Sequence, residues 1–103
     1  MGNVDAKTIA WIFLAISFWD KSPVSRREIS LSADAINHLV PLESELDLAI
    51  RFLTQQGLVE SKGTLIAITE AGRAILEPAH KDAANVFAVW KTLEASISSL
   101  NAA

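Results

Sequence analysis

Residues 49–59 read AIRFLTQQGLV and residues 65–73 read LIAITEAGR, and these two stretches decide the fold. The first ends a helix predicted over residues 43–56, because apolar residues recur in it at helical spacing. They are Leu46, Ala49, Ile50 and Leu53. Gly57 stands where a left-handed residue commonly ends a helix, and Leu58 follows it toward the core. The sequence therefore predicts a helix with a defined end before the next element.

Downstream of this helix, the pattern predicts a β-hairpin and two more helices. Short strands at residues 59–60 and 65–68 flank a tight SKGT turn. A threonine is a suitable cap for a short helix over residues 69–77. Pro78 fits the first position of a final helix over residues 78–100, because the missing N–H of proline needs no partner there.

Upstream, two further helices are expected. Residues 6–19 have a helical pattern that is apolar on both faces, so this N-terminal helix must be covered on both faces. Ser25 and Glu28 fit a capping box that opens the second helix. Apolar residues recur in that helix at helical spacing, and Pro41 ends it. These apolar residues are Ile29, Ala33, Ile36 and Val40.

The 103 residues fit a single domain, with an N-terminal helix (1–20), a core (25–76) and a C-terminal helix (78–100). Half of the residues are apolar, none is cysteine, and twelve acidic residues against nine basic ones give a net charge of −3. The lack of cysteine excludes a disulfide framework and a cysteine nucleophile. It fits a reducing compartment, and we expect the protein to be cytoplasmic. The negative charge disfavours a strongly basic nucleic-acid binder.

No membrane association is expected. The longest apolar run, residues 9–19, is shorter than the roughly 20 residues that a bilayer span needs. Asp5 precedes the run and no small-residue cleavage site follows it, so a secretory signal is not expected either.

The order of three helices, a hairpin and a Thr-Glu-x-Gly helix resembles the winged helix-turn-helix superfamily, in its MarR-like and PadR-like layout. The resemblance is carried by residues 49–59 and 65–73 and covers residues 25–76. It implies a mainly α fold with a small β-hairpin, in which terminal helices flank the winged core and form a dimer. The segment ADAINH (33–38), with Pro41 after it, also resembles a group of short bacterial winged-helix proteins. That second resemblance implies no activity.

The superfamily resemblance implies that the third helix lies in the major groove of DNA, with cations near it on phosphates. The candidate DNA contacts are Arg26, Arg27, Arg51 and Lys62. The same helix begins with acidic residues, Glu43 and Asp47 among them, which would repel phosphates. Acidic residues also favour the positive end of a helix, and Asp47 is spaced to pair with Arg51.

Apolar residues beside this acidic face favour a protein partner. Leu48 and Phe52 flank the buried stripe of the third helix, and we expect them to be partly exposed. An apolar pair beside carboxylates suits protein recognition better than DNA. The sequence thus predicts a small non-enzymatic regulatory or protein-interaction module, and the alternative is a dimeric DNA-binding transcriptional regulator. The expected interaction face consists of Glu43, Asp47, Leu48 and Phe52.

The last helix carries an a/d heptad pattern from Ala79 to Leu100. We interpret it as the seam of a homodimer, with packing on its own domain as the alternative. The N-terminal helix supports the dimer, because a short chain has little material to cover both of its apolar faces. The expected interface residues are Trp11, Phe18, Val86, Trp90, Leu93 and Ile97.

Catalysis is not expected, because no nucleophile-elbow, phosphate-loop or His-Glu-x-x-His motif is present. Asp34 and His38 lie four residues apart, but a metal site needs three or four ligands and the sequence offers no clear third. We interpret these two residues and Asn37 as tying the second helix to a neighbouring turn. No cofactor is expected. The MarR-like resemblance alone implies a small apolar effector. Aromatic residues at helical spacing more commonly form core or interface than a ligand site.

Overall fold

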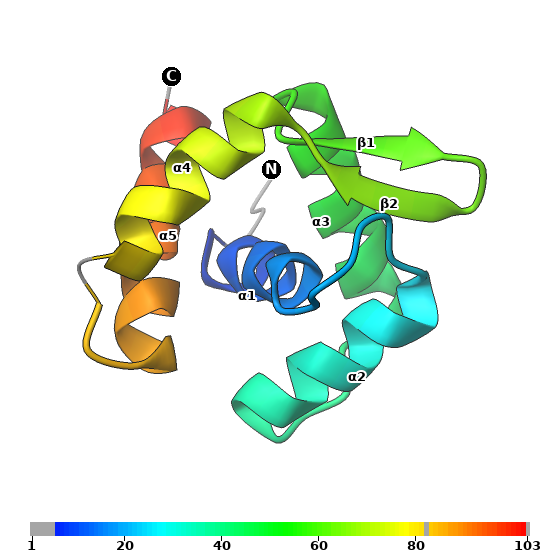
Figure 1. The fold of residues 1–103 in the computed structure, drawn as a ribbon, viewed down its shortest axis with the longest axis horizontal. Coiled ribbons are helices and arrows are strands. Elements are labelled where there is room, and N and C mark those ends of the chain that lie inside the picture. Colours follow the sequence, from blue (N-terminus) through cyan, green and yellow to red (C-terminus); the bar gives the residue numbers. More distant parts are fainter. Residues whose placement is uncertain (1–5, 82, 103) are drawn as a thin grey trace.

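The computed structural model describes residues 6–81 and 83–102, which form five helices and one antiparallel sheet (Figure 1). The helices are α1 (Ala6–Ser17), α2 (Arg26–Asn37), α3 (Glu43–Gln55), α4 (Glu70–Lys81) and α5 (Val86–Ala102). The strands are β1 (Val59–Lys62) and β2 (Leu65–Ile68). The expected fold class, mainly helical with a small β-hairpin, is confirmed. Within the described residues, no helix combines the length and apolar character needed to span a bilayer.

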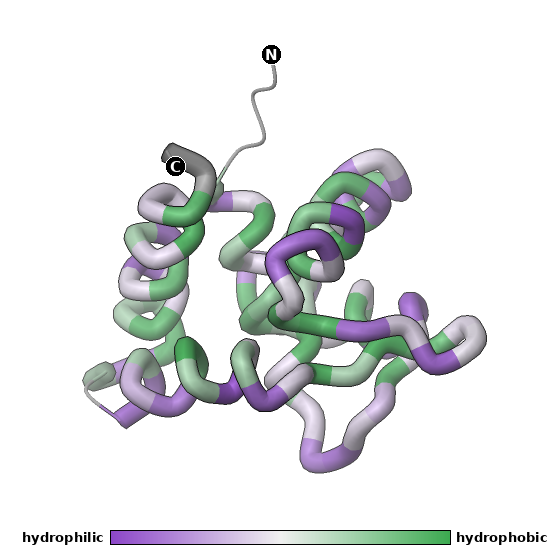
Figure 2. Tube along the Cα trace, turned by 90° about the horizontal axis from the view of Figure 1, so that it is seen from above, coloured by the Kyte–Doolittle hydropathy of each residue, from purple (hydrophilic) through white to green (hydrophobic). Residues whose placement is uncertain are grey.

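Helix α1 is the centre of the fold. Every residue from Ile9 to Ile16 is buried, so the helix has no solvent-facing side along this stretch. Helix α5 covers it on one side, and α2 and α3 cover it on the other (Figure 1). The amphipathic helices around it alternate between hydrophilic and hydrophobic residues along the chain (Figure 2). The short chain therefore has enough material to cover both faces of α1, and the argument for a dimer from a shortage of material does not hold.

The hairpin is joined to the segment that follows α1. Strands β1 and β2 pair from Val59 opposite Ile68 to Lys62 opposite Leu65, so β1 extends two residues beyond its predicted end. Gly63, with φ of 67°, opens the two-residue turn. On the other edge of β2, Val24 and Ile66 exchange two N–H···O bonds of 2.8 Å. These bonds hold the segment between α1 and α2 against the hairpin.

The sequence TEAG at residues 69–72 joins the start of α4 to the end of α3. Gly57 ends α3 with φ of 75°, as predicted, and the Thr69 hydroxyl donates to the Gly57 carbonyl at 2.6 Å. The Gly72 N–H donates to the same hydroxyl at 3.1 Å. A Cβ on Gly72 would overlap the Leu58 carbonyl oxygen. Only glycine therefore lets α4 pack this closely on the end of α3.

The predicted boundary between the last two helices is wrong. Pro78 lies inside α4 rather than at the start of a helix over residues 78–100. Leu76 and Ala79 are buried on either side of it, and this packing holds the helix despite the missing N–H of proline. The true start of α5 is marked by Asn85, whose side chain accepts from the Ala88 N–H at 3.0 Å.

Helix α2 also ends earlier than predicted. His38 takes a left-handed conformation, with φ of 58°, and its N–H donates to the Asp34 carbonyl at 2.6 Å. The chain therefore leaves the helix before Val40, which is exposed instead of buried. The contact between residues 34 and 38 is thus a backbone cap, which ends the helix at the turn leading to α3.

Candidate functional site

Arg26 connects the start of α2 to the exposed side of α3. The Ser25–Glu28 capping box fixes the first turn of α2, with the Glu28 N–H donating to the Ser25 hydroxyl at 3.1 Å and the Ser25 N–H donating to the Glu28 carboxylate at 2.9 Å. From this turn, Arg26 Nη2 donates to Glu43 Oε1 at 3.0 Å and to Asp47 Oδ1 at 2.8 Å. The bond to Glu43 is the main cause that raises the pKa of Arg26. Asp47 thus pairs with Arg26, and the expected pair with Arg51 is not formed.

The acidic residues of α3 remain largely exposed despite this pairing. The Glu43 side chain is 82% exposed and that of Asp47 is 59% exposed. Two carboxylates share one guanidinium, so one negative charge stays unbalanced here. Glu45 differs from both, because it accepts from the Leu42 N–H at 2.8 Å and caps the helix.

Large apolar side chains are exposed on α3 and on the segment that leads to it, and two of them, Leu42 and Leu48, are sequence neighbours of Glu43 and Asp47. Leu39, Val40 and Leu42 form the turn between α2 and α3, with exposed fractions of 61% to 67%. On α3 itself, Leu48 is 48% exposed. We call the six residues together the apolar–acidic surface: Leu39, Val40, Leu42, Glu43, Asp47 and Leu48.

Sequence reasoning identified only part of this surface. Leu48 and Phe52 are both partly exposed, as expected, and Phe52 also packs against the core. The turn residues were missed because Val40 continues the apolar spacing of α2 and was assigned to its buried face. The early stop at His38, a residue type that tolerates a left-handed conformation, was the signal that would have found them.

The remaining candidate DNA contacts lie on three different elements, α2, α3 and β1. Arg27 and Arg51 are exposed, and neither forms an ion pair with the residues that the structure describes. Lys62 lies at the end of β1 with its ammonium 3.9 Å from the Glu60 carboxylate. Of the four predicted phosphate contacts, Arg26 and Lys62 therefore lie beside carboxylates of their own chain.

The predicted dimer seam packs inside one chain. Trp11, Trp90, Leu93 and Ile97 are all buried, because α5 lies against α1. The assignment of these four residues to an interface between copies is therefore wrong, and the alternative of packing on the same domain accounts for the heptad pattern. Phe18 is exposed, and Val86 is half-buried against the core.

No metal centre emerges from residues 6–81 and 83–102, where no three His, Asp or Glu side chains gather closely enough to hold an ion. Comparison of the chain with protein-family models, curated proteins and solved structures gives no match. A proposal for the function therefore rests on the chemistry of the protein surface.

Proposed function

We propose that this protein is a small non-enzymatic winged-helix regulatory or protein-interaction module, and that the apolar–acidic surface binds its partner. The proposal rests on one observation. Four large apolar side chains are exposed on α3 and on the segment that leads to it, and α3 also carries two exposed carboxylates that share a single cation. Exposed apolar groups of this size in one region favour an interface.

The chemistry of the surface defines the complementary partner. Leu42 and Leu48 offer apolar contact area, and Glu43 offers a carboxylate that is mostly open to solvent. A complementary protein segment carries apolar side chains flanked by lysine or arginine, because complementary charge steers the encounter and fixes the register.

The alternative function is a dimeric DNA-binding transcriptional regulator. It is favoured by Arg27 and Arg51, which are exposed and form no ion pair within the described parts of the chain. The position of Arg26 weighs against it, since its guanidinium already bonds two carboxylates and those carboxylates repel phosphates.

A homodimer and a cytoplasmic location remain part of the proposal. Phe18, which follows α1, and Phe87, on α5, are exposed aromatic residues that a dimer through the first and last helices would bury. A reducing compartment suits the cysteine-free sequence.

Selection of displayed peptides against the folded protein tests the partner class. We expect enriched peptides that combine apolar residues with lysine or arginine and bind the Leu42→Ser/Leu48→Ser variant at least about tenfold more weakly. Leu31→Ser is the matched control, because it removes a similarly exposed apolar side chain on α2, outside the apolar–acidic surface. Peptides that lack basic residues, or that bind the double variant as tightly as the unmodified protein, contradict the proposal.

Random duplex DNA at low salt separates the two functions. We expect the protein to show no salt-dependent binding to this DNA. A steep decline, reduced in the Arg27→Gln/Arg51→Gln variant, would instead support the DNA-binding alternative.

A further inference from the structure

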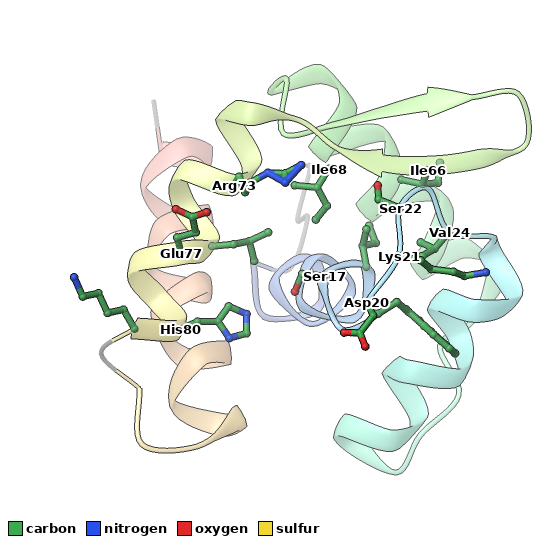
Figure 3. Close-up of a pocket in the computed structure, with 14 residues that line it drawn as sticks. Ser17, Asp20, Lys21, Ser22, Val24, Ile66, Ile68, Arg73, Glu77 and His80 are labelled. Carbon is green, nitrogen blue, oxygen red and sulfur yellow. The ribbon is translucent and has the colours of Figure 1, made fainter.

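Strand β1 forms an open edge of the sheet. The two strands of the sheet are β1 and β2, and the segment before α2 covers the other edge of β2, where Val24 and Ile66 exchange their two hydrogen bonds. These two residues lie next to each other in the close-up (Figure 3). Figure 1 shows β1 on the outer side of the hairpin. Within the part of the chain that the structure describes, no strand covers this outer side.

The register of the hairpin shows which backbone groups point outward from β1. Ser61 lies opposite Ile66. Because Ile66 directs both its N–H and its C=O toward Val24, it forms a non-hydrogen-bonded pair with Ser61. In such an antiparallel pair, the opposite residue also directs its N–H and C=O outward. The Ser61 N–H and C=O therefore point away from β2, and no described residue bonds to either group.

The residues along this edge are open to solvent. Glu60, Ser61 and Lys62 are exposed, and so are the turn residues Gly63 and Thr64. An exposed N–H and C=O at the edge of a sheet can pair with a strand of another chain. Ser61 therefore offers one donor and one acceptor that a second strand can reach.

Charged residues on the edge restrict which strand can pair with it, because like charges placed opposite each other are destabilising. Glu60 and Lys62 flank Ser61, and their side chains lie on the same face because they are two residues apart. The Lys62 ammonium lies 3.9 Å from the Glu60 carboxylate, and both side chains are more than half exposed. A pairing strand must therefore place a cation opposite Glu60 and an anion opposite Lys62.

The sequence of β1 itself meets this requirement. When a second copy of β1 runs antiparallel, with the two Ser61 residues opposite each other, each Glu60 faces Lys62 of the other copy. These charged pairs are non-hydrogen-bonded pairs, in which the side chains lie closer together. A parallel alignment in the same register would place Glu60 opposite Glu60, and the like charges disfavour it. The charges thus select both the partner strand and its direction.

We propose that β1 pairs with β1 of a second copy of this chain, antiparallel about Ser61, so that two hairpins form one four-stranded sheet. The two Ser61 residues exchange two N–H···O bonds, and Glu60 and Lys62 form an ion pair on each side of them. The dimer is weak, with a Kd of about 0.1–1 mM, because each copy contributes one short strand. This contact uses no residue of the apolar–acidic surface or of the first and last helices, so it is separate from both parts of the proposed function.

The test starts from the Phe18→Ser protein, because Phe18 is an exposed residue expected to support association through the terminal helices. In NMR spectra recorded up to about 2 mM protein at low salt, the Ser61 amide should shift with concentration and approach saturation. A mixture of isotope-labelled and unlabelled chains should show contacts between the α-protons of Glu60 and Lys62 of different copies, since these protons approach closely in a non-hydrogen-bonded pair. The proposal is overturned if the Ser61 amide does not shift or if these contacts are missing.

An exchange of charges between copies tests the register. Glu60→Lys and Lys62→Glu, each made in the Phe18→Ser protein, place like charges opposite each other and should each weaken self-association at least about tenfold. An equimolar mixture of the two variants restores opposite charges and should recover the Kd of the starting protein to within about threefold. Glu77→Lys is the matched control. It makes the same change in net charge as Glu60→Lys at an exposed position of α4, and it should leave the Kd unchanged.

Circular dichroism checks that every variant folds. Charge variants that self-associate as strongly as the starting protein would overturn the proposal, and so would a mixture that associates no better than the separate variants. Neither result bears on the apolar–acidic surface, because the selection of peptides tests that surface independently.

Discussion

The indole rings of Trp11 in α1 and Trp90 in α5 stack with their centroids 6.2 Å apart and their planes inclined by 24°. Each ring also donates its N–H to another helix. Trp11 donates to the Ala33 carbonyl of α2, and Trp90 donates to the Lys7 carbonyl of α1, both at 2.9 Å. The pair thus joins three helices around the centre of the fold, at the position where the sequence indicated a contact between two copies of the chain.

Trp90→Ala should destabilise the protein by about 3–5 kcal/mol, because it removes a buried ring and its stacking contact with Trp11. Trp90→Phe should cost less, since an aromatic ring remains in the core, although the N–H bond to the Lys7 carbonyl and part of the packing volume are lost. Urea unfolding measures both. Thr92→Ala, at an exposed position on the same helix, is the control and should change the free energy of unfolding by under about 0.5 kcal/mol. An equal effect at both positions would contradict the packing of α5 on α1.

Leu93→Ala should cost about 2–5 kcal/mol and leave the oligomeric state unchanged, because Leu93 is fully buried within its own chain. Phe18→Ser should instead weaken self-association through the first and last helices with little loss of stability, since Phe18 is exposed. Urea unfolding and analytical ultracentrifugation at several protein concentrations distinguish the two effects. If the unmodified protein is a dimer and Leu93→Ala is a folded monomer, Leu93 contacts the second copy and its assignment to the core of one chain is contradicted.

Gly72→Ala should destabilise the protein by about 1–3 kcal/mol or more, although alanine usually favours a helix. The added methyl group would overlap the Leu58 carbonyl oxygen and push α4 away from the end of α3. Ala74→Ser, at an exposed position of α4, is the control and should stay within about 0.5 kcal/mol. Thermal unfolding measures both, and an unchanged Tm for Gly72→Ala would disprove the close approach.

Acidification should weaken the fold through Glu28. Its bond to Lys21, together with the Ser25 backbone N–H, holds the pKa of the carboxyl below its ordinary value of 4.5. A lowered pKa in the folded state means that the stabilisation is present above the unfolded pKa and is lost as pH falls through the folded pKa.

The urea midpoint of the unmodified protein should therefore fall below about pH 4.5 more steeply than that of Glu28→Gln. Glutamine still accepts the Ser25 N–H but carries no charge for Lys21, so the comparison isolates the ion pair. Glu77→Gln is the control, because Glu77 is exposed and forms no ion pair with the described residues. If the urea midpoints of the unmodified protein and of Glu28→Gln change with pH in parallel, the Lys21–Glu28 ion pair does not cause the loss of stability.

Local features were predictable where short-range rules decide them. The capping box at Ser25 and the left-handed Gly57 follow from contacts within a few residues, and both are present. The place of Pro78 was predicted wrongly because it depends on packing with distant residues, and that of Val40 because apolar spacing was followed past a local stop at His38. A proline is tolerated inside α4 since its neighbours are buried, and Val40 is exposed since His38 ends the helix first.

The candidate site was only partly predictable for the same reason. The acidic start of α3 and the exposure of Leu48 follow from helical spacing. The bonds from Arg26 to Glu43 and Asp47 join residues that are distant in the chain, and no spacing rule indicates them. The outward direction of the Ser61 N–H and C=O follows from the bonds between Val24 and Ile66 on the other side of the hairpin, so it is set only in the folded chain.

The sequence by itself determined the helices, the hairpin and the residues that must be buried, because periodicity, caps and turns act over a few residues. Only the tertiary structure decided what buries them. A stripe of apolar residues shows that a helix face leaves water, but hydrophobic burial has no direction and does not specify a partner. For Leu93 and Ile97 that partner is α1 of the same chain.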